Sequence, residues 1–276
     1  MYNQRKLMLV KIFLALSSIS PRVKKLLWKQ WYQFLARHYQ TREWSFMNYG
    51  YAPIDEHSET VTLNEADEPD RYAIQLYHHV ASAVDLTNLD VLEIGSGRGG
   101  GASYVARYLK PKALTGMDFS DRAIQFCKRT HNVDGLSFTK GDAESLPFDA
   151  ASFDAVINIE SSHCYGSMEI FLANAKRVLR HNGYLLYADF RNVNDVARLH
   201  SLMKHSGMKI RKREDITANV LRSLDLDDRR KVTLIRALFR NWLLKPFLEF
   251  AGVKGSKIYS SFQSGAMVYL HYVLQK

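Results

Sequence analysis

The sequence predicts an α/β protein whose central sheet is doubly wound, mostly parallel and seven-stranded. Two observations support this prediction. Short apolar runs alternate with helical stretches between residues 89 and 190, and strands that alternate with helices pair in parallel through right-handed crossovers. The chain has 276 residues, 46% of them hydrophobic, so it can bury one substantial core. We therefore expect one main domain with helical additions.

Apolar periodicity gives the order of the expected elements. The expected strands are 89–94, 113–117, 136–139, 153–159, 183–190, 208–213 and 265–274. The expected helices around them are 71–84, 100–109, 120–130, 168–180 and 193–206. Residues 44–70 are rich in aromatic residues, turn formers and acids, and are expected to form an ordered loop or lid.

The remaining segments are additions to this core. Residues 217–250 are helical in pattern and strongly basic around Arg229, Arg230 and Lys231, so we interpret them as an insertion before the last strand. The predicted division is a basic helical N-terminal extension and lid, a core, a helical substrate cap and the last core strand, at residues 1–84, 85–216, 217–257 and 258–276.

Positive charge is concentrated at the N-terminus. The net charge is +10, and nine basic residues with no acid lie between Met1 and Arg42. Within this segment, apolar and basic residues fall on opposite faces of one helix, the basic face being Arg22, Lys25 and Lys29. Two hypotheses stay open: a surface helix packed on the core, or a helix that lies on an anionic membrane surface or covers a lipid cavity.

Several features bear on the compartment. The apolar run 7–16 is interrupted by Lys11 and is shorter than the roughly 20 residues that span a bilayer, so secretion or a membrane span is not favoured. Cys127 and Cys164 are too few for a disulfide framework. We expect a cytoplasmic protein, with peripheral association at the inner membrane surface through residues 1–42 as a further hypothesis.

A glycine-rich turn marks the first candidate ligand site. Residues 93–101 (EIGSGRGGG) directly follow a predicted strand and open a helix, and glycines there let the backbone turn tightly and approach a ligand. Asp118 follows the second strand, where a carboxylate can accept hydrogen bonds from both ribose hydroxyls. The competing role, a cap for helix 120–130, is weaker because Ser120 already offers one. A dinucleotide site would use the same features.

The segment after the third strand separates these possibilities. Residues 141–148 (GDAESLPF), followed by 153–157 (FDAVI), resemble the adenine-binding region of class I S-adenosylmethionine (SAM) methyltransferases. The resemblance spans roughly residues 85–190 and implies a Rossmann-like fold. It also implies that SAM is the cofactor and S-adenosylhomocysteine the product.

The same resemblance assigns roles to the cofactor-binding residues. It implies that Asp142 binds the adenine amine, that Phe119 packs beside the adenosine, and that Glu93 and the glycines flank the methionine part. The complete expected set is Glu93, Gly95, Ser96, Gly97, Asp118, Phe119, Asp142, Ala143 and Glu160.

A narrower resemblance extends upstream of the core. The carrying segments are 48–51 (NYGY), 66–69 (ADEP), 76–78 (LYH), 99–104 (GGGASY) and 160–165 (ESSHCY). Together they resemble the bacterial phthiotriol and phenolphthiotriol dimycocerosate methyltransferases, which O-methylate a secondary alcohol of a long-chain polyketide lipid. The resemblance implies a hydrophobic small molecule, polyketide or lipid as the acceptor. The far N-terminus and residues 217–257 match less well.

His163 is the candidate general base. It follows the fourth strand, beside the expected position of the methyl group, and an imidazole with an ordinary pKa near 6.5 can accept the proton of an attacking hydroxyl. The alternative is a histidine that only packs against Tyr165 or bonds to the backbone. No acid cluster faces His163 in sequence, and no metal site is expected because His78 and His79 point to different helix faces.

Two other functions are compatible with SAM binding. An RNA or protein methyltransferase would use the basic segments, but residues 158–161 (NIES) do not match the Asn/Asp-Pro-Pro-Tyr motif of enzymes that methylate amino groups, so nucleic acid is not the expected partner. A cyclase or a regulatory SAM-binding module has the same fold requirements. The acceptor molecule, the regiochemistry and the oligomeric state stay open.

Overall fold

The computed structural model describes residues 44–55, 60–239 and 241–276. Its centre is a seven-stranded sheet in the order β3-β2-β1-β4-β5-β7-β6, with β7 antiparallel to both of its neighbours and the first five strands parallel. The strands are β1 (Asp90–Ile94), β2 (Ala113–Asp118), β3 (Leu136–Lys140), β4 (Phe153–Ile159), β5 (Leu179–Asn192), β6 (Lys209–Asp215) and β7 (Met267–Gln275). The predicted mostly parallel sheet is confirmed.

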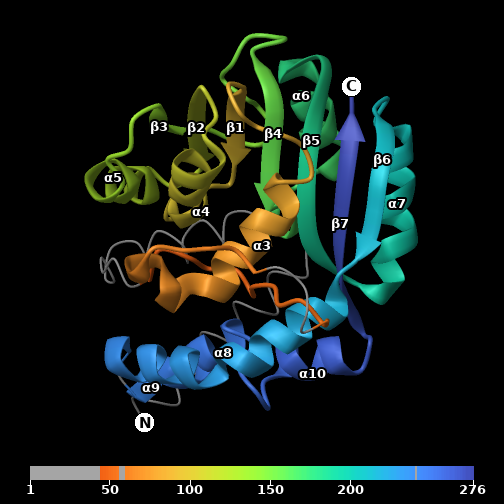
Figure 1. The fold of residues 1–276 in the computed structure, drawn as a ribbon. Coiled ribbons are helices and arrows are strands. Elements are labelled where there is room, and N and C mark those ends of the chain that lie inside the picture. The colour runs from red at the N-terminus through yellow and green to blue at the C-terminus, as the bar shows by residue number, and fades with distance from the viewer. Residues whose placement is uncertain (1–43, 56–59, 240) are drawn as a thin grey trace.

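Helices cover both faces of the sheet (Figure 1). They are α3 (Arg71–Ala81), α4 (Gly100–Tyr104), α5 (Asp121–Thr130), α6 (Met168–Val178) and α7 (Val196–His205). Successive residues of β1 enter different cores, Val91 beneath α3 and α4 and Leu92 beneath α6, because side chains of a strand alternate between faces. Both cores are built from apolar side chains that the alternating sequence pattern supplies.

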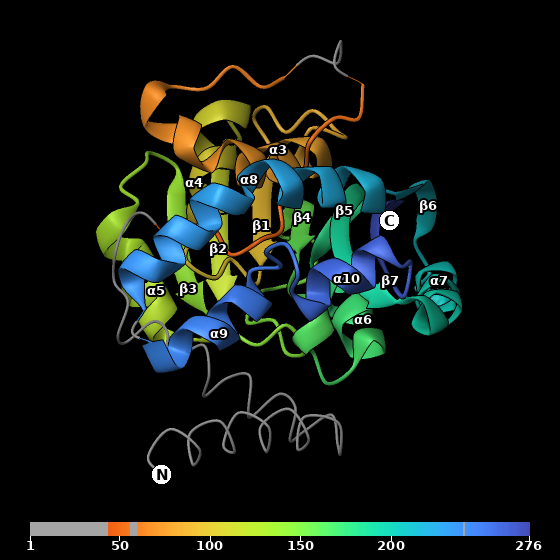
Figure 2. The same cartoon turned by 90° about the horizontal axis from the view of Figure 1, so that it is seen from below.

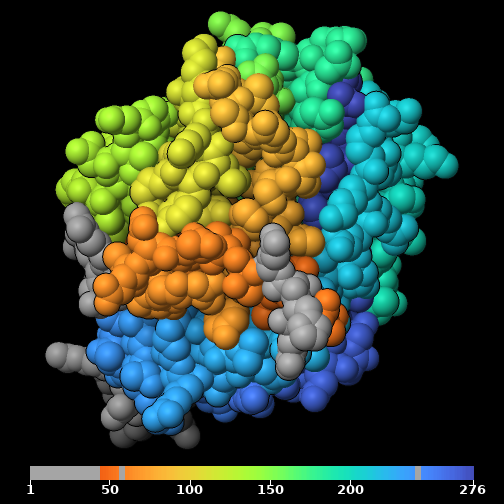
Figure 3. Space-filling model, in the orientation of Figure 1, coloured from red at the N-terminus to blue at the C-terminus, as the bar shows by residue number. Residues whose placement is uncertain are grey.

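A second group of helices lies across the carboxyl ends of the parallel strands (Figure 2). It consists of α8 (Thr217–Leu238), α9 (Asn241–Phe250) and α10 (Lys257–Gln263), and α8 packs against both others. Between this cap and the sheet runs the segment that begins at Trp44, seen as an orange belt above the blue helices in Figure 3. Tyr51 N donates to Tyr72 O of α3 at 2.9 Å, and Ala52 N donates to Asn219 O of α8 at 3.2 Å. Backbone hydrogen bonds thus attach the lid to α3 on one side and to α8 on the other.

Several predicted boundaries are wrong in detail. The expected helix 100–109 changes to π-helical geometry at Val105–Leu109, and the strand expected at 183–190 is longer, with β5 starting directly after α6. The helical stretch 217–250 is interrupted because Phe239 is extended, with φ −113° and ψ 137°. The part assigned to the last core strand, 258–276, also contains most of α10.

Two expectations concern membranes. The basic amphipathic helix around Arg22, Lys25 and Lys29 and the apolar run 7–16 lie outside the described residues. Within the described part of the chain, no helix is long and apolar enough to cross a membrane.

Candidate active site

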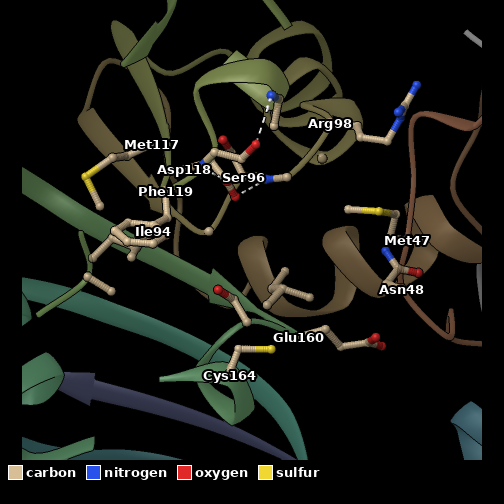
Figure 4. A pocket seen from close by; sticks show the side chains of 18 of the residues that line it. Met47, Asn48, Ile94, Ser96, Arg98, Met117, Asp118, Phe119, Glu160 and Cys164 are labelled. Carbon is tan, nitrogen blue, oxygen red and sulfur yellow. Dashed lines mark hydrogen bonds between the residues drawn. The ribbon is translucent and has the colours of Figure 1, made fainter. Parts of the chain in front are cut away.

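A pocket opens at the carboxyl ends of β1, β2 and β4, facing the lid (Figure 4). Ligands of open α/β sheets bind at this edge, where loops leave the strands. The pocket brings together the predicted residues Gly95, Ser96, Gly97, Asp118, Phe119, Asp142, Ala143 and Glu160. The predicted residues Glu93 and His163 are not part of its lining as the structure describes it.

The glycine loop leaves room for a ligand because it lacks side chains. Gly95 and Gly97 have φ of +82° and +54°, a region that residues with a Cβ rarely adopt. A Cβ on Gly95 would lie 1.9 Å from Ser161 Oγ, and one on Gly97 would lie 2.9 Å from Met47 Cε. The backbone therefore forms the wall of the pocket at these two positions, and the contact of this wall with the cofactor stays a prediction.

Asp118 ends β2 inside the pocket. Its two carboxylate oxygens accept hydrogen bonds from the backbone N–H groups of Gly97 at 3.0 Å and Ser120 at 2.8 Å (Figure 4). Burial raises the pKa of Asp118 to about 6 against these hydrogen bonds. A carboxylate offers about four lone-pair sites, so the backbone hydrogen bonds from Gly97, Ser120 and Phe119 do not use all of its acceptor capacity. Ser120 caps α5 by accepting from Ala123 N, which agrees with the expectation that Asp118 is not needed there.

Glu93 lies behind the glycine loop. It is 1% exposed, and its Oε1 accepts a hydrogen bond from Tyr77 Oη at 2.7 Å. Oε2 has no hydrogen-bond partner among the described residues. Burial raises the pKa of Glu93 to about 7. The contact of Glu93 with the methionine part of the cofactor therefore stays a prediction.

Asp142 and Ala143 line the pocket after β3. Asp142 Oδ1 accepts a hydrogen bond from Glu144 N at 3.0 Å, which closes a tight turn after the strand. Its predicted role with adenine stays a prediction. The cradle of glycines, the half-buried acceptor Asp118 and this turn together fit the adenosyl cofactor that the sequence predicts.

Glu160 connects the sheet to the lid. Its Oε1 accepts from Tyr49 N at 2.8 Å and from Tyr269 Oη at 3.0 Å, and its φ is +45°. Burial raises the pKa of Glu160 to about 7, partly opposed by these hydrogen bonds. A non-glycine residue at positive φ directly after a strand is a strained position, which is common at functional sites.

His163 lies in a single turn, Ser162–Cys164, that follows β4. Ser161 and Cys164 on either side of this position line the pocket, whereas the imidazole packs on Phe190 with ring centroids 4.4 Å apart. His163 Nδ1 lies 2.9 Å from Asp189 Oδ1. Burial opposes the charged imidazolium, but Cys164 and Asp189 outweigh it and raise the pKa of His163 to about 10.

Asp189 was missed by the sequence analysis, which found no acid facing His163. It lies on β5 and is 0% exposed, and it also accepts hydrogen bonds from Ser162 Oγ and His163 N. Arg191 NH1 lies 3.2 Å from Asp189 Oδ2, the same oxygen that accepts from Ser162 Oγ and His163 N. Burial would raise the pKa of Asp189, but His163 and Arg191 hold it well below its usual range. The available signal was an acid inside the apolar run 183–190, because buried charges are paired.

The lid supplies lining residues to which no role was assigned. Met47 and Asn48 border the pocket opposite the glycine loop (Figure 4). Arg98 is 3% exposed, and its guanidinium lies 4.0 Å from the ring centre of Phe126 and 5.4 Å from that of Trp44. The sequence analysis assigned no role to these residues, because their position at the pocket depends on the lid packing against the glycine loop.

Comparison with known proteins assigns the chain to a family. The methyltransferase domain model matches residues 92–187. A phthiotriol/phenolphthiotriol dimycocerosates methyltransferase of Mycobacterium tuberculosis is 37% identical over 260 residues, covering 93% of this chain and 94% of the relative. The chain belongs to this methyltransferase family. A fatty-acid O-methyltransferase of Mycolicibacterium smegmatis is 39% identical and covers 78% of this chain and 79% of its own length.

Solved structures agree with the fold of this SAM-dependent methyltransferase. The cyclase SpnF has a TM-score of 0.68 at 17% identity, covering 90% of this chain and 94% of the other. A sarcosine dimethylglycine methyltransferase from Galdieria sulphuraria has a TM-score of 0.66 at 12% identity, covering 87% and 97%. Because a cyclase and a methyltransferase share this fold, the reaction depends on the site and on family membership.

Proposed function

We propose that this methyltransferase transfers the methyl group of SAM to a hydroxyl of a lipid or hydrophobic polyketide. The names of two relatives support a lipid acceptor, one on dimycocerosates and one on fatty acids. We assign the ribose to Asp118, the adenine amine to Asp142 and the methionine part to the loop that contains Gly95 and Gly97. Bound SAM would supply an electrophilic methyl group on a positively charged sulfur.

The observation that carries the proposal is the hydrogen bond between His163 and Asp189 beside the pocket. A carboxylate that accepts from Nδ1–H fixes the tautomer of a neutral imidazole, so that the lone pair lies on Nε2. His163 then accepts the proton of the hydroxyl as its oxygen attacks. Asp189 is a positioning residue in this scheme, because it acts through His163.

The pKa of His163 near 10 has a direct consequence for this role. The neighbouring Cys164 and Asp189 favour the imidazolium over the neutral ring, and an imidazolium cannot accept a proton. A positive charge in the pocket disfavours a second one on His163, so we expect the pKa to fall when the cofactor binds. The neutral imidazole that results is still a stronger base than an isolated histidine if Asp189 stays ionised.

The acceptor has an apolar place to bind. A second cavity lies between the lid and the cap, and it shares Phe46, Met47 and Asn48 with the cofactor pocket. Most of its lining is apolar, including Leu234, Ile235, Phe247 and Phe250, and the charged Asp70, Arg230 and Lys231 also line it. Concave sites lined mainly by apolar and aromatic side chains are typical of hydrophobic ligands. We propose that the acyl or polyketide chain occupies this cavity while its hydroxyl reaches the cofactor pocket.

The test is a His163→Ala variant assayed with the lipid acceptor. We expect turnover to fall about 10²- to 10⁴-fold, the usual contribution of a general base, with SAM affinity within a factor of about two of wild type. His205→Ala, an exposed change on α7, is the matched control. A near-normal rate in a folded His163→Ala protein would return His163 to a structural role.

We also propose that residues 1–42 bring the enzyme to an anionic membrane surface that holds the acceptor. The proposal rests on charge alone, since this segment carries nine basic residues and no acid.

A further inference from the structure

Two histidines and a glutamate meet on the α3 side of the sheet, outside the pocket described above. They are His79 of α3, Glu214 of β6 and His271 of β7, and their ligand atoms all lie within 4.8 Å of one another. His79 Nε2 is 2.9 Å and His271 Nδ1 is 3.3 Å from the same oxygen, Glu214 Oε2. The sequence analysis expected no metal site because His78 and His79 point to different helix faces, and it did not consider partners as distant in sequence as Glu214 and His271.

The fold brings His79, Glu214 and His271 together. Glu214 and His271 are opposite one another in the antiparallel pair β6 and β7, so their side chains share one face of the sheet. Helix α3 crosses that face in front of β4 and β5 (Figure 1), and the side chain of His79 in its last turn reaches Glu214 of β6. The space-filling view shows α3 in light orange directly beside β6 in cyan (Figure 3).

We propose that His79, Glu214 and His271 bind one first-row divalent metal ion, with zinc as the best match. Imidazole nitrogen and carboxylate oxygen are zinc ligands, and a tetrahedral zinc with arms near 2.0–2.1 Å holds its ligand atoms about 3.3 Å apart. The two measured separations, 2.9 and 3.3 Å, are close to that value. Three protein ligands leave the fourth position to water.

The local environment supports ligand-competent side chains. His79 Nε2 and His271 Nδ1 both face Glu214 Oε2, so two imidazole nitrogens and one carboxylate oxygen converge on one point. His271 is fully buried and the ring of His79 stacks on Tyr51, with centroids 4.3 Å apart. Both rings are therefore held in place before any ion arrives.

Lys212 is the competitor for this position. Its Nζ lies 2.8 Å from Glu214 Oε2, the oxygen on which the histidines converge. An ammonium group there neutralises the carboxylate without a metal, and hydrogen bonds alone then hold the cluster together. The Lys212 side chain is 45% exposed, so it can turn into solvent when an ion binds. Its positive charge would weaken the affinity of the site for a cation, so removing this charge should strengthen metal binding.

The position of the cluster suggests a structural role. Tyr77, whose hydroxyl binds Glu93, precedes His79 by two residues, and Tyr269, whose hydroxyl binds Glu160, precedes His271 by two. None of the three proposed ligands lines the cofactor pocket. A bound ion would link α3 to the β6–β7 edge. It would thereby help to position Tyr77 and Tyr269, which hydrogen-bond to Glu93 and Glu160 beside the cofactor pocket. The ion itself would not contact the reacting atoms.

Zinc titration of the chelator-treated, full-length protein tests the proposal, with calorimetry as the measurement. We expect one zinc per chain and a higher midpoint of thermal unfolding with zinc, since a ligand of the native state stabilises it. Affinity should fall at least tenfold in His79→Gln and in Glu214→Gln, and it should rise in Lys212→Met. His205→Gln, on the exposed face of α7, is the control and should bind zinc like wild type.

The results of these experiments distinguish a zinc site from a cluster that hydrogen bonds alone hold together. Equal zinc affinity in wild type, His79→Gln and Glu214→Gln would overturn the proposal, as would weaker binding in Lys212→Met. His79 and Glu214 are partly exposed, so their variants are expected to fold, and circular dichroism checks this. None of these measurements depends on methyl transfer, so they stand apart from the proposed function.

Discussion

At the scale of single residues, Asp118 is the clearest test of the cofactor assignment. It is a half-buried carboxylate at the end of β2 whose lone-pair sites exceed its backbone hydrogen bonds. We expect Asp118→Ala to weaken SAM binding by about 1–3 kcal/mol, because hydrogen bonds to a charged acceptor are lost. Calorimetric titration with SAM measures this. Asp121→Ala is the control, since Asp121 is exposed and bonds to Lys140 outside the pocket.

Unchanged SAM affinity in a folded Asp118→Ala protein would remove the ribose assignment. Tight binding of NAD instead of SAM would contradict the cofactor itself.

The pair of His163 and Asp189 predicts a shift in the pH profile. The reaction requires neutral imidazole, so the rate rises with pH and levels off above the pKa of His163. Asp189 is one of the groups that raise this pKa. In Asp189→Asn we therefore expect the rising limb to move to lower pH and the plateau to fall, because the base becomes weaker and less well oriented.

The measurement is kcat/KM for the acceptor at saturating SAM between about pH 6 and 11, a range that extends above the raised pKa of His163. Asp195→Asn, an exposed change, should keep the wild-type profile. If the Asp189→Asn limb stays in place while only the plateau falls, Asp189 supports the fold and does not act through His163.

At the scale of elements, the lid depends on Gly50. Its φ is +84°, and a Cβ there would lie 2.3 Å from Ser223 Oγ of α8. Gly265 has a similar φ of +73°, but nothing lies within 4 Å of its Cβ position. We expect Gly265→Ala to cost about 1–2 kcal/mol from backbone strain, and Gly50→Ala about 2–4 kcal/mol from strain plus overpacking.

Denaturant unfolding compares the two variants. Gly50→Ala should also bind SAM more weakly, because it displaces the lid residues Met47 and Asn48 from the pocket wall. Equal unfolding free energies and equal SAM affinities would show that the lid does not rest on this contact.

The elements also show what sequence could predict. Strands β1, β2, β4 and β5 were predictable because buried parallel strands are continuous apolar runs between glycine or polar turns. Their carboxyl ends define the pocket, so the glycine loop, Asp118 and Asp142 were found together. The order of β6 and β7 depends on a long return from the cap, which no local pattern encodes.

Contacts between residues far apart in the chain could not be predicted from the sequence, because no local pattern encodes them. Asp189 contacts His163 only because β4 and β5 are neighbours in the sheet. Tyr49 contacts Glu160 only because the lid packs against the sheet. The break between α8 and α9 was missed because apolar periodicity continues across Phe239, which packs on Phe247 with ring centroids 3.5 Å apart. Tertiary packing decided that boundary.

At the scale of the whole molecule, charge is unevenly distributed. Of the net +10, nine positive charges lie within residues 1–42, so the remainder is close to neutral. We expect the protein to sediment with vesicles of phosphatidylglycerol at low salt and to be released as salt rises. Changing Arg22, Lys25 and Lys29 to Gln should weaken this binding by roughly two decades, at about 1 kcal/mol per charge, without altering SAM affinity.

Phosphatidylcholine vesicles are the control for this experiment. Wild-type protein that ignores anionic vesicles at low salt would contradict a membrane role and favour a helix packed on the core.

The central claim, that this enzyme moves a methyl group from SAM to a lipid hydroxyl, has one direct test. Purified full-length protein is incubated with SAM labelled in its methyl group and with a lipid extract, and products are analysed by mass spectrometry. We predict one S-adenosylhomocysteine per labelled lipid, with the label stable to mild alkali as in a methyl ether, and at least about a hundredfold slower formation of both products with His163→Ala. SAM binding without S-adenosylhomocysteine, label in RNA or protein, or an alkali-labile methyl ester would contradict the claim.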